Sequence, residues 1–198
     1  MWLCILLKPR LLQVRQLGLP RLDLATLITS EMKIPISPEQ YITEAAEIQW
    51  RTMPTAPLLP GAERLIRHLH HHRVPIAVAT STYRAAYRRK VASHADVFSL
   101  FGHVVNGTDD PDVVHGKPAP DIFRVCAGRF PGRPAASDCL VLEDSPAGVR
   151  AGLAAGCQVV MLPDERMWDT PQYIPAGVSQ VLRSWDDFQP ELFGLPKF

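Results

Sequence analysis

The stretch CLVLEDSPAGV, residues 139–149, runs an apolar segment directly into two adjacent carboxylates and then into the start of a helix. Its first four residues predict a short buried strand, and the serine and proline after the acids are typical of a helix entry. A strand that ends in paired acids can aim them at a ligand from the edge of a sheet. Glu143 and Asp144 are therefore candidate ligand-binding residues, although acids at a helix entry also favour the positive end of the helix dipole without any ligand.

Short strand-like segments alternate with helix-like segments on both sides of this stretch. The strands are expected at 74–79, 103–105, 139–142 and 157–162, and the helices at 83–91, 121–128 and 145–155. Repeated strand–helix–strand units predict a parallel sheet that is covered by helices on both faces. The expected fold class is therefore α/β, with a Rossmann-type parallel sheet.

Residues 20–53 differ from this pattern, because they predict two amphipathic helices with no strand between them. These helices are expected at 23–32 and 39–50, joined through Pro35 and Pro38. We expect the chain to have three parts: an atypical N-terminal segment at residues 1–19, a helical appendage at residues 20–55, and an α/β core domain at residues 56–198.

The overall charge gives no reason to expect a nucleic-acid or membrane partner, since 21 basic and 20 acidic residues leave a formal net charge of +1. The four cysteines show no metal-ligand spacing and are expected to be reduced thiols in a cytoplasmic protein. The apolar opening, residues 1–7, is far shorter than the ~20 residues of a membrane span, and its basic residues follow rather than precede it. We expect a monomer.

Polar side chains follow three of the predicted strands. Thr80 and Ser81 come after the first, Lys117 after the second, and Glu143 with Asp144 after the third. In an open parallel sheet the carboxyl ends of the strands share one crevice, so these residues are expected to converge there. A hydroxyl, an ammonium group and two carboxylates suit a phosphate group together with a divalent cation, because the first two can bind phosphate oxygens and the acids suit Mg²⁺.

Each cluster alone also has a purely structural explanation. A Thr-Ser-Thr run after a strand is often a helix N-cap, and a single lysine is often only a solvated side chain. Helix caps do not explain why all three clusters occur in order, each after a strand. The combination favours a phosphate and metal site.

Three motifs carry a resemblance to a known family: AVATS at residues 77–81, GKPAPDIF at 116–123 and LEDSPAG at 142–148. With these motifs the chain resembles the haloacid dehalogenase (HAD) superfamily of phosphohydrolases. Within that superfamily it looks most like the pseudouridine-5′-phosphatase subgroup, through DDPDVVHGK at 109–117 and DFQPELFGLP at 187–196. The resemblance implies a HAD-like core domain, with residues 20–55 as part of a helical cap.

The resemblance also implies a chemistry and a role for each candidate residue. The family hydrolyses small phosphomonoesters, such as nucleotide or sugar phosphates, through an aspartyl-phosphate intermediate with Mg²⁺ as cofactor. By likeness, Thr80 and Ser81 would bind the phosphate, and Lys117 would clamp both phosphate and nucleophile. Glu143 and Asp144 would hold the metal. The subgroup likeness makes pseudouridine 5′-phosphate the expected substrate.

The family's first motif, a strand ending in Asp-x-Asp-Gly, has no counterpart in these 198 residues. Asp23 is the only acid before residue 31, and alanine and threonine stand where the second aspartate and the glycine would be. We therefore expect the first core strand to be missing or replaced, and a chain truncated at its N-terminus. Residues 2–7 offer an apolar replacement strand, which would bring Lys8 near the nucleophile position.

Three hypotheses remain open at this point. The chain is a HAD-type phosphatase whose nucleophile motif is absent from this sequence, so that it is inactive as it stands. Alternatively, it is a non-catalytic protein that binds phosphate and metal, a pseudoenzyme or interaction protein. The third hypothesis is that the sequence does not fold alone, which a cooperative thermal unfolding transition would contradict.

Overall fold

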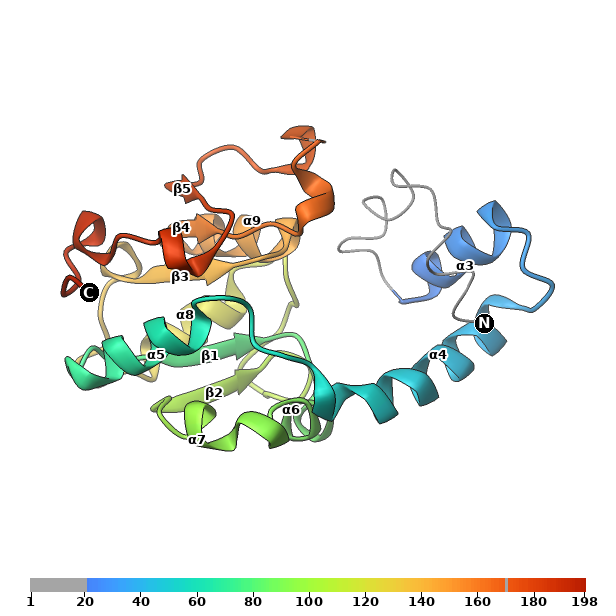
Figure 1. The fold of residues 1–198 in the computed structure, drawn as a ribbon, viewed down its shortest axis with the longest axis horizontal. Helices are drawn as coiled ribbons and strands as arrows, with labels where there is room; N and C mark the ends of the chain where they lie inside the picture. The colour runs from blue at the N-terminus through green and yellow to red at the C-terminus, as the bar shows by residue number, and fades with distance from the viewer. Residues whose placement is uncertain (1–20, 170) are drawn as a thin grey trace.

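The structure of the chain, a computed structural model, describes residues 21–169 and 171–198 (Figure 1). The predicted N-terminal segment at residues 1–19, with its replacement strand at residues 2–7, lies outside this part of the chain. In the described part, no helix combines the length and the apolar character needed to cross a bilayer.

All strands in the described residues pair in parallel, and they form two separate sheets (Figure 1). The first sheet pairs β1 (Ala77–Thr80) with β2 (His103–Asn106), and the second has the order β3 (Leu140–Glu143), β4 (Gln158–Met161) and β5 (Gln180–Val181). In register, Thr80 lies opposite Asn106 and Glu143 lies opposite Met161. The arrows of β1 and β3 point the same way in Figure 1, so their carboxyl ends lie on the same side of the domain, as the sequence predicts.

Helices follow the strands in the order expected for an α/β domain. They are α5 (Ala62–His71), α6 (Arg84–Lys90), α7 (Ala95–Phe98), α8 (Asp121–Gly128) and α9 (Pro146–Ala155). Short 3-10 turns complete the described chain: η1 (Met53–Thr55), η2 (Ala92–His94), η3 (Ala136–Asp138), η4 (Glu165–Met167), η5 (Pro171–Tyr173), η6 (Trp185–Asp187) and η7 (Pro190–Phe193). The parallel strands and intervening helices confirm the predicted α/β fold class.

Alternate side chains of β4 enter two different core layers. Val159 and Met161 pack with residues of α8 and α9, whereas Val160 packs with α5 and the C-terminal segment. Successive side chains of a strand point to opposite faces of a sheet, so this alternation shows that β4 is covered on both sides. Such burial explains why the segment is almost wholly apolar in the sequence.

Helix α9 begins at the Ser145–Pro146 pair and lies very close to the sheet. The Ser145 hydroxyl oxygen accepts a hydrogen bond from the Gly148 N–H at 3.0 Å, which caps the helix. Gly152 then lets the helix approach β3 and β4, because a Cβ at this position would lie 2.9 Å from Val159 and 3.3 Å from Val141. The missing side chain thus determines how closely α9 packs on the strand that carries the paired acids.

Two helices precede the core, α3 (Arg21–Glu31) and α4 (Pro38–Thr52), and they lie beyond the carboxyl ends of β1 and β2 (Figure 1). Ser37 and Gln40 form a reciprocal capping box at the start of α4. At its other end, the Trp50 ring lies 4.8 Å from the Arg89 guanidinium of α6. The two predicted helices are therefore present, and the boundary at residues 55 and 56 stays a prediction.

Three cysteines of the described chain, Cys126, Cys139 and Cys157, are free thiols. Burial raises the pKa of the Cys126 and Cys157 thiols to about 11, so both are neutral near pH 7. They pack in the same apolar layer as Val159, as expected for structural thiols.

Replacing Gly152 by alanine is expected to lower the free energy of unfolding by about 1–3 kcal/mol, because the added Cβ overpacks the contact with Val159. Gly128→Ala is the matched control, since Gly128 ends α8 and has open space where its Cβ would go. Helix propensity alone predicts a gain of up to ~1 kcal/mol for that control. Urea unfolding, followed by circular dichroism, measures the free energy of unfolding of both variants. Equal changes in the two variants would contradict the close packing of α9.

Candidate functional site

A pocket of about 320 Å³ opens at the carboxyl ends of β1 and β3. Four of the five residues predicted for the site line it, and Ser81 does not. The lining residues are Leu59, Ala79, Thr80, Lys117, Leu142, Glu143, Asp144 and Trp185. The structure thus brings together residues that are far apart in the sequence, because parallel strands end at one edge.

Lys117 reaches between the two sheets. Its ammonium group donates to the Ala79 carbonyl oxygen at 3.1 Å and to Glu143 Oε1 at 2.5 Å. The side chain is 11% exposed, and its Nζ lies 4.9 Å from the centre of the Phe123 ring. A lysine ammonium has three N–H groups, so one remains for a ligand after these two contacts. Lys117 is therefore an ordered, nearly buried cation and not a solvated surface lysine.

Glu143 is turned into the protein. Its Oε2 accepts hydrogen bonds from the Asp144 N–H at 3.1 Å, the Ser145 N–H at 3.2 Å and the Ser145 hydroxyl at 3.0 Å. The ion pair with Lys117 satisfies Oε1. Gly148 lies against the carboxylate, since a Cβ on that residue would come 2.0 Å from Glu143 Cδ. Neighbouring protein groups therefore hold both carboxylate oxygens.

Asp144 is exposed, in contrast to Glu143 beside it. Crowding by the surrounding protein and the neighbouring charge of Glu143 raise the pKa of the Asp144 carboxyl. Both effects disfavour the charged form, whereas a bound cation would favour it. Asp144 is thus the pocket carboxylate that can accept a ligand from solvent.

Thr80 ends β1 and faces the pocket, whereas Ser81 is exposed outside its lining. The Thr80 hydroxyl oxygen accepts a hydrogen bond from the Thr82 N–H at 3.1 Å, which leaves its own proton available to a ligand. The Ser81 carbonyl oxygen accepts from the Thr108 hydroxyl at 2.7 Å. Tyr83 is the N-cap of α6 and makes no side-chain capping bond, so the Thr-Ser-Thr run does not cap that helix.

Trp185, for which the sequence favours a core anchor over a substrate platform, also lines the pocket. Its side chain is 7% exposed and packs with Phe188, as expected for an anchor of the C-terminal segment. Leu59 lines the pocket as well. Neither residue follows a predicted strand, so the positions of the strand ends do not identify them as pocket residues. They line the pocket because segments distant in the sequence fold back over the sheet.

The carboxylates offer a partial set of metal ligands. The described residues contain no group of three His, Cys, Asp or Glu side chains that could hold a metal ion. Two adjacent acids still fit Mg²⁺, which keeps several waters and takes only one or two carboxylates together with phosphate oxygens. Asp23 offers no third acid, since it lies in the first turn of α3 and is not among the residues that line the pocket.

Comparisons with known proteins agree with this geometry. A family model for haloacid dehalogenase-like hydrolases matches residues 21–156. A Drosophila melanogaster protein named probable pseudouridine-5′-phosphatase is 48% identical over 182 residues, which cover 92% of this chain and 78% of that protein. The (DL)-glycerol-3-phosphatase 2 of Arabidopsis thaliana is 41% identical over 190 residues, covering 94% of this chain and 78% of that protein.

A solved structure is similar as well. The crystal structure of a HAD family hydrolase from Deinococcus radiodurans, which has bound phosphate and sodium, matches with a TM-score of 0.68 at 25% identity. The match covers 91% of this chain and 80% of that one. Sequence and fold thus agree, and the superfamily resemblance carried by the three motifs is confirmed. The chain belongs to the haloacid dehalogenase-like hydrolase family.

Proposed function

We propose that this protein is a phosphatase of small phosphomonoesters and that the pocket between β1 and β3 binds the phosphate group. The observation that carries this proposal is the position of Lys117, whose ammonium group is fixed by Ala79 and Glu143 and has one N–H left for an anion. The Thr80 hydroxyl lines the same pocket and can donate to a second phosphate oxygen.

The substrate class follows from the size of the pocket and from the relatives. A pocket of about 320 Å³ is at the lower end of the range for small-molecule sites. The similar proteins are named for pseudouridine 5′-phosphate and glycerol 3-phosphate, both small phosphomonoesters. We propose pseudouridine 5′-phosphate as the first substrate to test, because the relative with that name is 48% identical.

Asp144 and Glu143 are proposed to hold a Mg²⁺ ion beside the phosphate. Asp144 would supply the more accessible oxygen, whereas Glu143 shares its carboxylate with Lys117. The bound ion would neutralise charge on the phosphate group. Ser81, predicted as a phosphate ligand, does not line the pocket. Its proposed role is only to form the turn after Thr80.

A second candidate function is binding of the ester without hydrolysis. The specific observation in its favour is the absence of an Asp-x-Asp-Gly sequence from the 198 residues. Thr80, Lys117, Glu143 and Asp144 account for binding and charge neutralisation, but none is a free nucleophile aimed at phosphorus. Hydrolysis by the aspartyl-phosphate route needs an aspartate in that place.

Both functions predict Mg²⁺-dependent binding of pseudouridine 5′-phosphate that weakens by about 10- to 100-fold in Lys117→Met, since a hydrogen bond to a charged group contributes about 1.5–3 kcal/mol. Lys90→Met, on the exposed end of α6, is the matched control and should bind like the wild type. Titration calorimetry measures the affinity for pseudouridine 5′-phosphate at a temperature at which every variant is folded.

Phosphate release separates the two functions. Release of inorganic phosphate by the wild-type chain, lost in Lys117→Met, would establish the phosphatase. Tight binding without release would establish the second function. Absence of binding to both pseudouridine 5′-phosphate and glycerol 3-phosphate would contradict both.

Asp144→Asn is expected to reduce the affinity for Mg²⁺ about 10-fold or more, because it removes a negative charge without changing the size of the side chain. Binding of the ester in the absence of Mg²⁺ should stay the same or improve, since the variant repels the phosphate less. Asp138→Asn, at the opposite end of β3, is the matched control. Equal Mg²⁺ affinity in both variants would remove Asp144 from the proposed metal site.

Gly148→Ala is expected to displace the Glu143 carboxylate, because the new Cβ would lie 2.0 Å from Glu143 Cδ. The contact between Lys117 and Glu143 would be disturbed, which should weaken ester binding and lower the free energy of unfolding by about 1–3 kcal/mol. Calorimetry and urea unfolding measure the two effects. Wild-type binding by a fully folded Gly148→Ala chain would show that the position of Glu143 does not matter to the pocket.

A further inference from the structure

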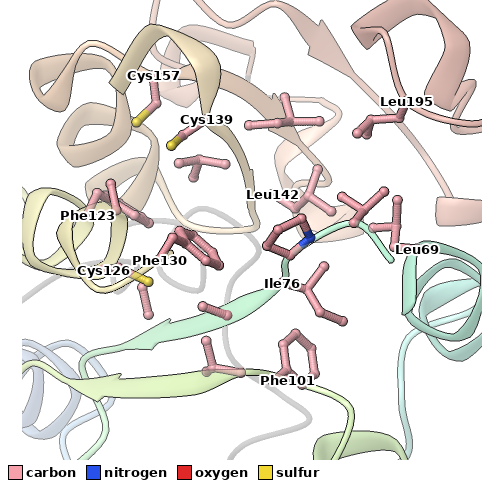
Figure 2. Close-up of a pocket in the computed structure, with 18 of the residues that line it drawn as sticks. Leu69, Ile76, Phe101, Phe123, Cys126, Phe130, Cys139, Leu142, Cys157 and Leu195 are labelled. Atoms are coloured by element: carbon pink, nitrogen blue, oxygen red, sulfur yellow. The ribbon is translucent and has the colours of Figure 1, made fainter. Parts of the chain in front are cut away.

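The pocket that holds Lys117 also has an apolar part, formed by Leu59, Ala79, Leu142 and Trp185. Three of these residues also line a deeper apolar cavity of about 680 Å³ between β1 and β3, and Leu59 does not. Figure 2 shows this cavity, with Leu142 among the side chains around it. Leu59 lines the pocket alone, so it belongs to the outer wall of the pocket rather than to the floor.

Leu59 is 49% exposed, which is ordinary for a single leucine on a protein surface and by itself indicates no function. Its position is informative, because it lines the same pocket as the nearly buried ammonium group of Lys117. Small-molecule sites combine a few placed polar groups with apolar walls that cover the rest of the ligand. Leu59 is thus placed to contact the part of a ligand that the polar groups do not hold.

The segment that carries Leu59 is fixed to the C-terminal part of the chain. The Leu59 carbonyl oxygen accepts a hydrogen bond from the Ala62 N–H at 3.0 Å, which closes the turn before α5. Gly61, in this turn, has a φ of +78°, and a Cβ on it would lie 2.5 Å from the Asp186 nitrogen. Arg64 Nη2 donates to the Asp186 carbonyl oxygen at 3.2 Å. The turn therefore packs directly on η6, which holds Leu59 at the pocket before a ligand binds.

We propose that Leu59 is a specificity-determining residue, which binds the organic part of the ester and favours esters that carry a flat heterocyclic ring. This role rests on the proposed function, because it requires a phosphate group held by Lys117 and Thr80. A phosphate bound at the strand ends directs the organic part of the ester towards solvent, past the outer wall. The face of a ring can pack on a leucine side chain, whereas the hydroxyl groups of a small polyol find no hydrogen-bond partner there.

Three ligands separate the contributions of the ring, the sugar and the phosphate. They are pseudouridine 5′-phosphate, ribose 5-phosphate, which has the sugar and phosphate without the ring, and inorganic phosphate. The wild type should bind pseudouridine 5′-phosphate more tightly than ribose 5-phosphate by about 10-fold, because only the first presents a ring to Leu59. Titration calorimetry in the presence of Mg²⁺ measures the three affinities.

Leu59→Ala is expected to weaken binding of pseudouridine 5′-phosphate about 10-fold, because it removes the apolar contact with the ring. Binding of ribose 5-phosphate and of inorganic phosphate should change by less than about 2-fold. Leu58→Ala makes the same chemical change at the neighbouring position, which does not line the pocket, and should leave all three affinities at the wild-type values. Leu59→Met keeps the apolar volume and should retain the preference for the ring.

The outcomes distinguish the role of Leu59 from the proposed function. If the wild type binds inorganic phosphate but binds the two esters equally, the specificity role is overturned and the phosphate site stands. An equal loss of affinity for all three ligands in Leu59→Ala would also overturn it, since Leu59 would then act on the phosphate. Failure of the wild type to bind any of the three ligands would contradict the proposed function and overturn the role of Leu59 with it.

Discussion

The ion pair between Lys117 and Glu143 is the contact on which both the fold and the pocket depend. Lys117 also donates to the Ala79 carbonyl oxygen, so one side chain connects β1 of the first sheet to β3 of the second. Its charge is nearly buried, with 11% of the side chain exposed, and Glu143 is 8% exposed. Removing one partner of such a pair leaves the other as an uncompensated charge, at a cost of about 3 kcal/mol or more. The proposed binding of phosphate would therefore depend on the integrity of this edge of the domain.

Glu143 and Asp144 have different roles because the chain turns between them. Glu143 is the last residue of β3, and the start of α9 directs N–H and hydroxyl donors of Ser145 at its carboxylate. Asp144 lies in the turn itself and stays exposed. Glu143 thus holds the lysine in position, whereas Asp144 is open to a ligand. Two neighbouring carboxylates in a sequence do not reveal these different roles, because the roles depend on the direction in which each side chain points.

Much of the core could be predicted from local sequence, because each element ends at a distinct residue pattern. The helix expected at 121–128 is observed at those residues, and α9 begins one residue after the expected start. β5, at Gln180–Val181, was not predicted, because two residues carry no periodicity. The strand expected from residue 74 begins at Ala77, where pairing with His103 of β2 becomes possible. The place of Trp185 in the pocket depends on long-range folding, which local patterns do not contain.

The pocket and the apolar cavity of about 680 Å³ between β1 and β3 share part of their walls. Ala79, Leu142, Glu143 and Trp185 line both, so the floor of the pocket is one end of this cavity. The ends of β1 and β3 therefore carry both the polar groups of the pocket and the apolar surface beneath them. Lys117 contacts both strands at this edge, so any change in the spacing of the two sheets would move its ammonium group relative to Thr80 and Asp144. The geometry of the pocket thus depends on how the two sheets are held together.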